Sequence, residues 1–368
     1  MVLGGIDIAG GNRSTAYLRD VPRQSGTDVP RLSIVVPARN EERKIREALE
    51  SLLGQEYSNL EFIAINDRST DHTGEILADM AAADARLCVI NIAELPVGWL
   101  GKNYALYEGA RRAGGELLLF TDADVVMDSS AVAKAVQYLK ANSLQHLAVM
   151  PKVRMPTLAL RIFCSAFGIF FSGYMRQWKA KDPASRSFIG VGAFNLVTAE
   201  AYKAVGTHIA IAMRPDDDIK LGKLLKRAGY RQEMIFGMGL LEVEWYSSLR
   251  ELIDGLMKNA FAGLEYSAVR SIGAGIAVLL PNVWPFVAIF VVGGVTRILY
   301  LMVVAVLFLF ISDANQFYGQ PRWYALAQPV SSILFVYILW KAMVLALSND
   351  GIRWRGTHYP KLLRANRI

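Results

Sequence analysis

The sequence predicts an α/β fold, in which a mainly parallel sheet is flanked by helices, followed by transmembrane helices. Three observations support this prediction. From Leu32 onward, strand-like and helix-like segments alternate at the spacing of βαβ units. Leu117–Phe120 is apolar without polar alternation, which is typical of a strand buried on both faces of a parallel sheet. Beyond Ile272 the chain is dominated by long apolar stretches.

The predicted elements of the first half follow one another with short connections. The strands are Leu32–Val36, Glu61–Asn66, Leu87–Ile92, a segment ending at Asp122, and Leu147–Val153. The predicted helices are Glu41–Leu53, the segment through Ile76, Leu77 and Met80, Lys102–Ala113, Ala199–Val205 and a helix from Asp216 to Gly229. Right-handed crossovers between such strands bring their carboxyl ends, and the loops that follow them, to one edge of the sheet.

Three apolar stretches in the last third are long enough to cross a bilayer, namely Ile272–Val292, Val295–Ile311 and Ala325–Leu347. Leu158–Met175 is also apolar, but Arg161 and several glycines interrupt it. We therefore expect that segment to lie at the membrane interface or to line an acceptor groove.

Composition narrows the classes of partner. The 368 residues carry a net charge of +7, which suits an anionic membrane surface or phosphate-bearing substrates. The sequence holds no nucleic-acid-binding module, so nucleic acid is not an expected partner. Its four histidines lack metal-ligand spacing and its two cysteines suggest no disulfide framework, which argues against a zinc site.

Two aspartates, Asp122 and Asp124, stand at the end of the most apolar strand. Residues i and i+2 of a strand point to the same side, so both carboxylates can reach one Mg²⁺ or Mn²⁺ ion. The alternative is a solvated Asp-x-Asp sequence at a turn or a helix cap. Asp216, Asp217 and Asp218 open a predicted helix, where acidic residues are also favoured by capping and by the helix dipole.

The order of the motifs resembles the family 2 inverting glycosyltransferases, which have the Rossmann-like GT-A fold. The resemblance covers Leu32–Gly229 and lies in SIVVPARNEE, SLLGQ, NDRSTDHTG, TDAD and Asp217-Asp218. The segment LPVGWLGKN and the trailing apolar stretches are similar to the membrane-bound branch of hopanoid-associated and carotenoid glycosyltransferases, with ceramide glucosyltransferases as relatives.

This resemblance implies a nucleotide-sugar donor site in the first loops. Pro37, Ala38, Arg39 and Glu41 would contact the base and ribose. Asp67 would accept a hydrogen bond from the base, for which a charged acceptor is well suited. Helix capping is the alternative role for Asp67.

The same resemblance implies which residues bind the diphosphate and which bind the metal ion. Lys102 would lie near the diphosphate as a point charge, although a surface lysine is the alternative. Asp122 would reach the ribose or the metal, and Asp124 would coordinate Mn²⁺ or Mg²⁺ between the two phosphates.

The resemblance also implies a general base in the acidic triplet. The family's Glu/Asp-Asp-x-x-Leu motif matches Asp217 to Leu221, so Asp218 would be the base and Asp217 its supporting neighbour. Asp216 leaves the register of this match open. Adjacent carboxylates raise one another's pKa, which is useful for a base and is also expected of an exposed acidic cap.

The chain departs from processive members of the family, which carry a Gln-x-x-Arg-Trp motif after the base. Here the corresponding region, 244–248, reads EWYSS, so transfer of a single sugar is expected. Four aromatic residues before the first apolar stretch suggest either an interface helix or internal packing: Trp245, Tyr246, Phe261 and Tyr266.

The predicted organisation is a flexible arm (1–30), a GT-A domain (31–240), an amphipathic interface segment (241–271), about three transmembrane segments (272–347) and a basic tail (348–368). The basic tail argues for a cytoplasmic carboxyl end, whereas three spans and a cytoplasmic GT-A domain would put it outside, so the topology stays open.

The expected function is transfer of one sugar from a nucleotide-diphosphate donor, a UDP-sugar, to a membrane lipid or polyisoprenoid at the cytoplasmic face of a bacterial-type membrane. The alternatives are a sugar nucleotidyltransferase and a non-catalytic membrane protein that retains a nucleotide-sugar domain. A nucleotidyltransferase usually opens with a Gly-x-Gly-x-x-Leu loop, where this chain has Pro-Ala-Arg-Asn-Glu.

Overall fold

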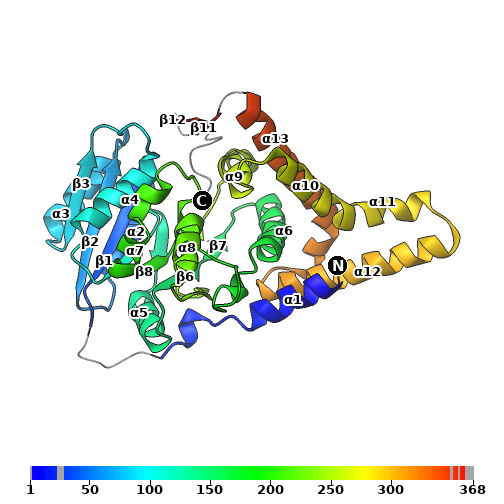
Figure 1. The fold of residues 1–368 in the computed structure, drawn as a ribbon, viewed down its shortest axis with the longest axis horizontal. Coiled ribbons are helices and arrows are strands. Elements are labelled where there is room, and N and C mark those ends of the chain that lie inside the picture. Colours follow the sequence, from blue (N-terminus) through cyan, green and yellow to red (C-terminus); the bar gives the residue numbers. More distant parts are fainter. Residues whose placement is uncertain (1, 23–28, 349–350, 355–356, 361–368) are drawn as a thin grey trace. The chain divides into compact units, whose positions relative to one another are not determined.

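A computed structural model describes residues 2–22, 29–348, 351–354 and 357–360 (Figure 1). The chain divides into two compact units. The sheet unit consists of Ser14–Arg154 and Gln177–Trp245. The helical unit consists of Met1–Arg13, Met155–Arg176 and Tyr246–Ile368.

A seven-stranded sheet with the order β3-β2-β1-β4-β8-β6-β9 forms the centre of the sheet unit. Strands β3, β2, β1 and β4 are parallel, β8 is antiparallel to β4 and β6, and β6 is parallel to β9. The predicted mainly parallel α/β fold is therefore confirmed. The strands are β1 (Leu32–Ala38), β2 (Leu60–Asp67), β3 (Leu87–Ile92), β4 (Leu117–Phe120), β6 (His146–Met150), β8 (Asn195–Thr198) and β9 (Gln232–Phe236).

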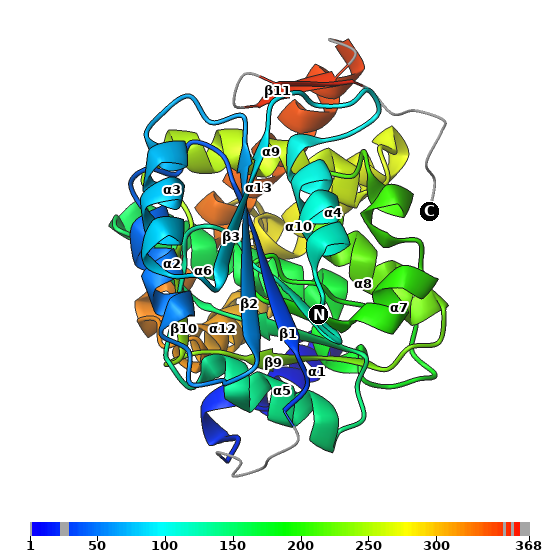
Figure 2. The same ribbon diagram turned by 90° about the vertical axis from the view of Figure 1, so that its left-hand side faces the viewer.

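Helices cover both faces of this sheet because its central strands are apolar on both sides. Every residue of β4 is buried, as the uninterrupted apolar run predicted. Figure 2 shows α2 and α3 on one side of the strands and α4, α7 and α8 on the other. The helices are α2 (Ile45–Leu53), α3 (Thr73–Ala83), α4 (Gly101–Arg112), α5 (Ala131–Ala141), α7 (Ala199–Ala204) and α8 (Asp217–Arg227), with short 3-10 turns η1 (Leu18–Asp20), η2 (Gln177–Lys179) and η3 (Thr207–Ile211).

A second, three-stranded sheet begins directly after the Asp122/Asp124 pair. Its order is β5 (Val125–Met127), β10 (Leu241–Glu244) and β7 (Lys152–Arg154). Because β5 starts at the residue after Asp124 and pairs with β10, the end of β10 is brought close to the carboxyl edge of the large sheet.

The helical unit contains α1 (Val2–Arg13), α6 (Leu158–Met175), α9 (Leu249–Gly263), α10 (Ala268–Asn282), α11 (Trp284–Val291), α12 (Gly294–Phe317), η4 (Arg322–Ala327), α13 (Gln328–Ser348) and the hairpin β11 (Gly351–Trp354) and β12 (Thr357–Pro360). Within the described residues, three helical runs are long and apolar enough to cross a membrane: Leu158–Lys179, Gly294–Phe317 and Arg322–Ser348. The pair α9 and α10, bent by 116°, would add a fourth if it formed one span.

Two of the predicted membrane segments differ from the structure. The expected span Ile272–Val292 is broken at Val283 into α10 and α11, with Pro281 and Pro285 on either side of the break. Conversely, Leu158–Met175 is an unbroken helix that is long and apolar enough to span, because its glycines are tolerated inside a helix and Arg161 lies near its first turn.

The flexible arm predicted for residues 1–30 contains helix α1. Arg13 forms an ion pair with Asp313 of α12 at 2.6 Å, and Asp7 pairs with Arg176, the residue that caps α6, at 3.3 Å. A Cβ on Gly5 would overlap the ring of Phe310, so this glycine is where α1 approaches α12. Gly5 therefore serves close helix packing in a segment that was predicted to be flexible.

Phe261 and Tyr266, two of the aromatic residues before the first apolar stretch, pack against each other inside the helical unit. Phe261 is fully buried and meets Tyr266 edge to face at 5.5 Å between ring centroids, which is internal packing. The predicted basic tail lies partly outside the described residues, which include only 351–354 and 357–360 beyond Ser348.

Helix α4 packs unusually close to the sheet, and Gly109 is the point of contact. A Cβ at this position would lie 2.4 Å from Val35 Cγ1 and 2.7 Å from Ile65 Cδ1, on β1 and β2. We predict that Gly109→Ala destabilises the sheet unit by about 1–3 kcal/mol, because overpacking forces the helix or the strands to move. The measurement is the thermal unfolding midpoint of the purified protein. Arg112→Ala, an exposed change on the same helix, is the control, and an equal midpoint for both variants would contradict the prediction.

Candidate active site

The loops that carry the predicted site residues meet at one edge of the parallel sheet. Asp67 is the last residue of β2, and Asp122 and Asp124 follow β4. Strand β1 lies between them and continues through Pro37 and Ala38, which pair with Ile65 and Asn66. The predicted loop thus begins two residues later than expected, and the buried Ala38 belongs to the core.

Asp67 is almost fully buried and lies in a cluster of arginines. Arg68 donates hydrogen bonds to both of its carboxylate oxygens, at 2.7 Å and 3.2 Å. Arg39 Nη1 lies 3.9 Å from Asp67 Oδ2. A Cβ on Gly101 would lie 2.3 Å from the same oxygen, so the first residue of α4 packs directly on this carboxylate. The structure places Asp67 and Arg39 side by side and adds Arg68 to them.

Glu41 lies in the same region, in the turn that precedes helix α2. Its amide donates to Thr73 Oγ1 at 2.8 Å, and its carbonyl accepts from the amides of Lys44 and Ile45. The first loop is thereby tied to α3 on one side and to α2 on the other.

Lys102, in the first turn of α4, lies between the two groups of aspartates. Its Nζ is 2.7 Å from Asp122 Oδ1 and 3.8 Å from Asp217 Oδ2. Burial lowers the pKa of Lys102, but Asp122, Asp217 and Asp218 raise it by more, so its pKa is raised overall. A permanently charged lysine therefore bridges the residues predicted to bind metal and those predicted to supply the base.

Asp124 has a different cationic neighbour, Lys44, whose Nζ lies 3.6 Å from Asp124 Oδ2. Burial and the adjacent Asp122 raise the pKa of Asp124 to about 6, while Lys44 opposes this rise. Two carboxylates this close together suit a divalent cation. Among the described residues no group of three or more His, Cys, Asp or Glu side chains is arranged to hold a metal. The pair therefore fits a cation such as Mg²⁺ or Mn²⁺ that takes its other ligands from phosphates and water.

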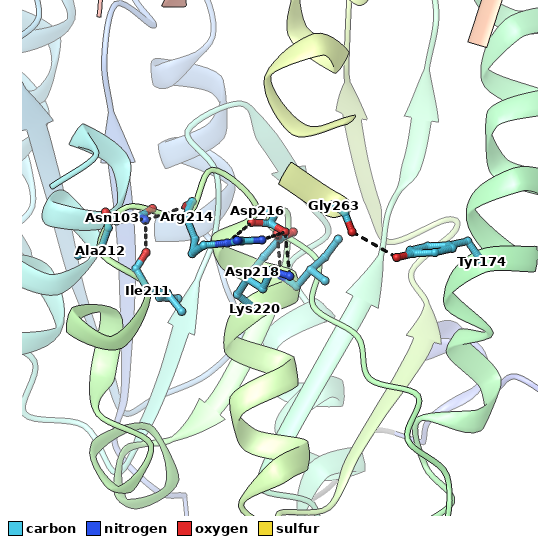
Figure 3. Close-up of polar contacts among 10 residues, drawn as sticks. Asn103, Tyr174, Ile211, Ala212, Arg214, Asp216, Asp218, Lys220 and Gly263 are labelled. Carbon is cyan, nitrogen blue, oxygen red and sulfur yellow. Dashed lines mark hydrogen bonds and ion pairs between the residues drawn. The ribbon is translucent and has the colours of Figure 1, made fainter. Parts of the chain in front are cut away.

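Asp216, the first residue of the acidic triplet, is held in a buried ion cluster (Figure 3). Arg214 contacts both of its oxygens, at 3.0 Å and 3.1 Å, and Lys220 lies 3.4 Å away. All three side chains are almost fully buried. Removing one partner from such a cluster would leave an uncompensated buried charge, so the arrangement fixes the start of α8 rather than offering a reactive group.

Asp218 is held by backbone amides and keeps part of its surface accessible. Gly192 N donates to Oδ2 at 2.7 Å, and Ile219 N lies 2.8 Å from Oδ1. Burial and the adjacent Asp217 raise the pKa of Asp218 to about 7, while Lys102 lowers it. A carboxylate with this pKa can take up a proton near neutral pH.

Gly192 marks the place where the acidic groups converge. A Cβ there would lie 2.8 Å from Asp122 Oδ2, 3.4 Å from Lys102 Nζ and 3.5 Å from Asp218 Oδ2. Residues that are far apart in the sequence therefore surround one backbone position, and any side chain there would obstruct them.

Two further glycines, Gly190 and Gly222, allow this loop to pack directly against helix α8. A Cβ on Gly190 would lie 1.9 Å from the carbonyl oxygen of Asp218, and one on Gly222 would lie 1.8 Å from that of Ile189. In the sequence this loop is a Gly-x-Gly segment at 190–192, a pattern that indicates a turn but not the element that the turn packs against.

Asn103 is a residue that the sequence reading missed. Its buried Nδ2 lies within hydrogen-bonding distance of three carbonyl oxygens, those of Ile211 (2.7 Å), Ala212 (3.1 Å) and Arg214 (2.9 Å) (Figure 3). Because Asn103 follows Lys102 on α4, these bonds tie the lysine-bearing helix to the segment that leads into α8. An asparagine inside a predicted helix gives no indication in the sequence that it will bind the carbonyl groups of a distant segment.

Comparisons with known proteins agree with this geometry. Residues 33–193 match the family described as Glycosyl transferase family 2. The 4,4′-diaponeurosporenoate glycosyltransferase of Staphylococcus haemolyticus is 25% identical over 249 residues, which is 66% of this chain and 64% of that protein. Its counterpart in Staphylococcus aureus (strain USA300) is 23% identical over 272 residues, covering 73% of this chain and 68% of that protein. The chain thus spans slightly less than two thirds of the first relative's length.

Among solved structures, a mannosyltransferase from Pyrobaculum calidifontis in complex with GDP-Man and Mn²⁺ is similar over 94% of this chain and 95% of that one. The TM-score is 0.57 and the sequence identity 17%, so the similarity concerns the fold. Residues 33–193 therefore form a family 2 glycosyltransferase domain within a GT-A-like fold, and the chain is similar to the 4,4′-diaponeurosporenoate glycosyltransferases.

Proposed function

We propose that this protein is a membrane-anchored, metal-dependent inverting glycosyltransferase that moves one sugar from a nucleotide-diphosphate donor to a lipid or polyisoprenoid acceptor. The observation that carries the proposal is the convergence of Asp122, Lys102 and Asp218 around Gly192. This convergence supports a single site in which Asp122 and Lys102 lie on the side of the leaving group and Asp218 lies on the side of the base.

The proposed donor is a UDP-sugar, held by the loops after β1 and β2. Asp67 would accept a hydrogen bond from the base, while Pro37, Arg39 and Glu41 would contact the base or the ribose. Ala38 is buried and would support this loop from the core. The contact between Arg39 and Asp67 supports this assignment, because it puts two of these side chains at one point of the sheet edge.

Mn²⁺ or Mg²⁺ would be held by Asp124 and Asp122, with Lys102 beside the diphosphate. When bound, the cation neutralises the charge that develops on the departing nucleoside diphosphate. The crowding that raises the pKa of Asp124 supports the assignment, because bringing positive charge to the pair relieves it.

The transfer step needs a base on the opposite side of the sugar from the leaving group. The acceptor oxygen attacks the anomeric carbon as the bond from that carbon to the phosphate oxygen breaks, and the bonding electrons leave with the nucleoside diphosphate. Asp218 takes the proton of the acceptor hydroxyl, and Asp217 supports it through its contact with Lys102. Inversion at the anomeric carbon follows from attack opposite to the leaving group.

An apolar acceptor is supported by the helical unit and by the relatives. The three helices long and apolar enough to span a membrane would anchor the protein in a bacterial-type cytoplasmic membrane, with the sheet unit facing the cytoplasm. Homologous proteins named for a carotenoid substrate support a polyisoprenoid acceptor.

The test is a screen of radiolabelled nucleotide sugars with membranes that contain the protein, followed by lipid extraction. UDP-glucose, UDP-N-acetylglucosamine and GDP-mannose are the first donors. We expect label in the lipid extract with one donor only when Mn²⁺ or Mg²⁺ is present. Label in a water-soluble nucleotide product instead of lipid would support a sugar nucleotidyltransferase.

Replacing the proposed base should stop transfer without preventing donor binding. We predict that Asp218→Asn lowers kcat by roughly 10²–10⁴-fold, because the amide cannot accept the acceptor proton. Mn²⁺-dependent binding of UDP, measured by calorimetry, should stay within about twofold of wild type. Asp79→Asn, an exposed change on α3, is the control. Turnover at the wild-type rate in Asp218→Asn would exclude this residue as the base.

Replacing the proposed metal ligand should instead weaken binding. We predict that Asp124→Ala reduces Mn²⁺-dependent UDP affinity by about tenfold or more, since one of the two carboxylates that hold the cation is lost. Asp79→Ala should bind as wild type does. Unchanged affinity in Asp124→Ala would remove the metal role from this residue.

The raised pKa of Asp218 predicts the pH dependence of the reaction. The base must be deprotonated before it can accept a proton, so activity should fall as pH drops below the pKa of about 7. We expect log kcat/KM to lose about one unit per pH unit on this acidic side. The measurement is kcat/KM across roughly pH 4–9, and a profile that stays flat down to the ordinary aspartate range near pH 4 contradicts the assignment.

A further inference from the structure

Lys44 connects the Asp122/Asp124 pair to the small sheet. It is the residue before α2, and its Nζ donates a hydrogen bond to the carbonyl oxygen of Glu244 at 2.9 Å. The same nitrogen lies 3.6 Å from Asp124 Oδ2 and 3.9 Å from Glu244 Oε1. Three acceptors on two segments therefore hold one ammonium group beside the outer carboxylate of the pair.

Each carboxylate of the pair thus has its own lysine. Lys102 pairs with Asp122 at 2.7 Å, and Lys44 lies beside Asp124 at the longer distance of 3.6 Å. The side chain of Lys44 is about one third exposed, at 36%, whereas that of Asp124 is 24% exposed. A long, partly exposed side chain at this distance can move away more easily than the buried strand end that carries Asp124.

A divalent cation and Lys44 compete for Asp124. A cation held by Asp124 would put a second positive centre close to the ammonium group of Lys44, which lies 3.6 Å from the same carboxylate. Like charges at such separations repel strongly where water is partly excluded. A bound diphosphate would remove this repulsion between the cation and Lys44, because its negative oxygens can bind both the metal ion and the displaced ammonium group.

We propose that Lys44 is the resident counter-ion of Asp124 in the donor-free protein, so that the divalent cation enters together with the nucleotide diphosphate rather than before it. The inference rests on the proposed function and deepens it. Lys44 is a positioning residue in this role: it delays metal binding until the group that the metal must neutralise has arrived.

The proposal predicts strong coupling between the two ligands in the wild-type protein. Mn²⁺ binding, followed by the loss of the electron paramagnetic resonance signal of free Mn²⁺, should be weak without nucleotide and at least about tenfold tighter with UDP or GDP. Because coupling is reciprocal, Mn²⁺ should tighten the nucleotide by the same factor.

The discriminating variant is Lys44→Gln, whose amide can still donate to the carbonyl of Glu244 but carries no charge. We expect it to bind Mn²⁺ without nucleotide about tenfold more tightly than wild type, and the coupling factor to fall correspondingly. Lys44→Met, which lacks the hydrogen bond as well, should show the same gain. Arg46→Met removes a positive charge from an exposed position on the same helix and should match wild type.

The outcomes separate this inference from the proposed function. Mn²⁺-dependent nucleotide binding in wild type, with nucleotide-free Mn²⁺ affinity unchanged in both Lys44 variants, would leave the proposed function standing and overturn the role of Lys44. An equal gain in Arg46→Met would also overturn it, since net charge alone would then explain the result. Absence of any Mn²⁺ binding with either nucleotide would overturn both proposals. Unfolding midpoints of the variants identify any loss of folded protein.

Discussion

The salt bridges of Lys102 are the interactions on which the arrangement of the site depends. Its ammonium group lies 2.7 Å from Asp122 Oδ1 and 3.8 Å from Asp217 Oδ2, so two acidic segments that would repel each other are held together. Asn103, the next residue, binds the carbonyls of the segment that leads into α8. One turn of α4 therefore fixes both the electrostatics and the backbone geometry, and the close packing of α4 on the sheet at Gly109 fixes that turn.

The three aspartates of the acidic triplet differ in their burial and in the groups that they contact. Asp216 is neutralised by Arg214 and Lys220, Asp217 faces Lys102, and only Asp218 is held by neutral amides with part of its surface accessible. Its carboxylate therefore gains no full counter-charge, and burial raises its pKa toward neutrality. Three identical side chains in a row acquire three different chemical characters because α8 turns each one toward a different neighbour.

A sequence pattern predicts structure correctly where it has a single structural meaning. The apolar run before Asp122 predicted a buried strand, since only a sheet covered on both faces accommodates it. The helical unit shows the opposite case. Pro281 and Pro285 flank the break at Val283 that divides an apolar stretch long enough to span, and Gly5 supports packing in a segment that looked flexible. Hydropathy measures how apolar a segment is, but not where its backbone bends or what it packs against.

The sequence alone determined the α/β class, the parallel strands, the apolar helices and the identity of the acidic motifs, because periodicity and motif order are local properties. Only the tertiary structure decided which aspartate of the triplet keeps accessible surface, which lysine lies beside Asp122 and which beside Asp124, and that Gly192 sits among these groups. Those properties depend on distances between residues up to about a hundred positions apart in the chain. No local pattern encodes such distances, because they are set by how α4, α8 and the loop before β8 pack on one sheet edge.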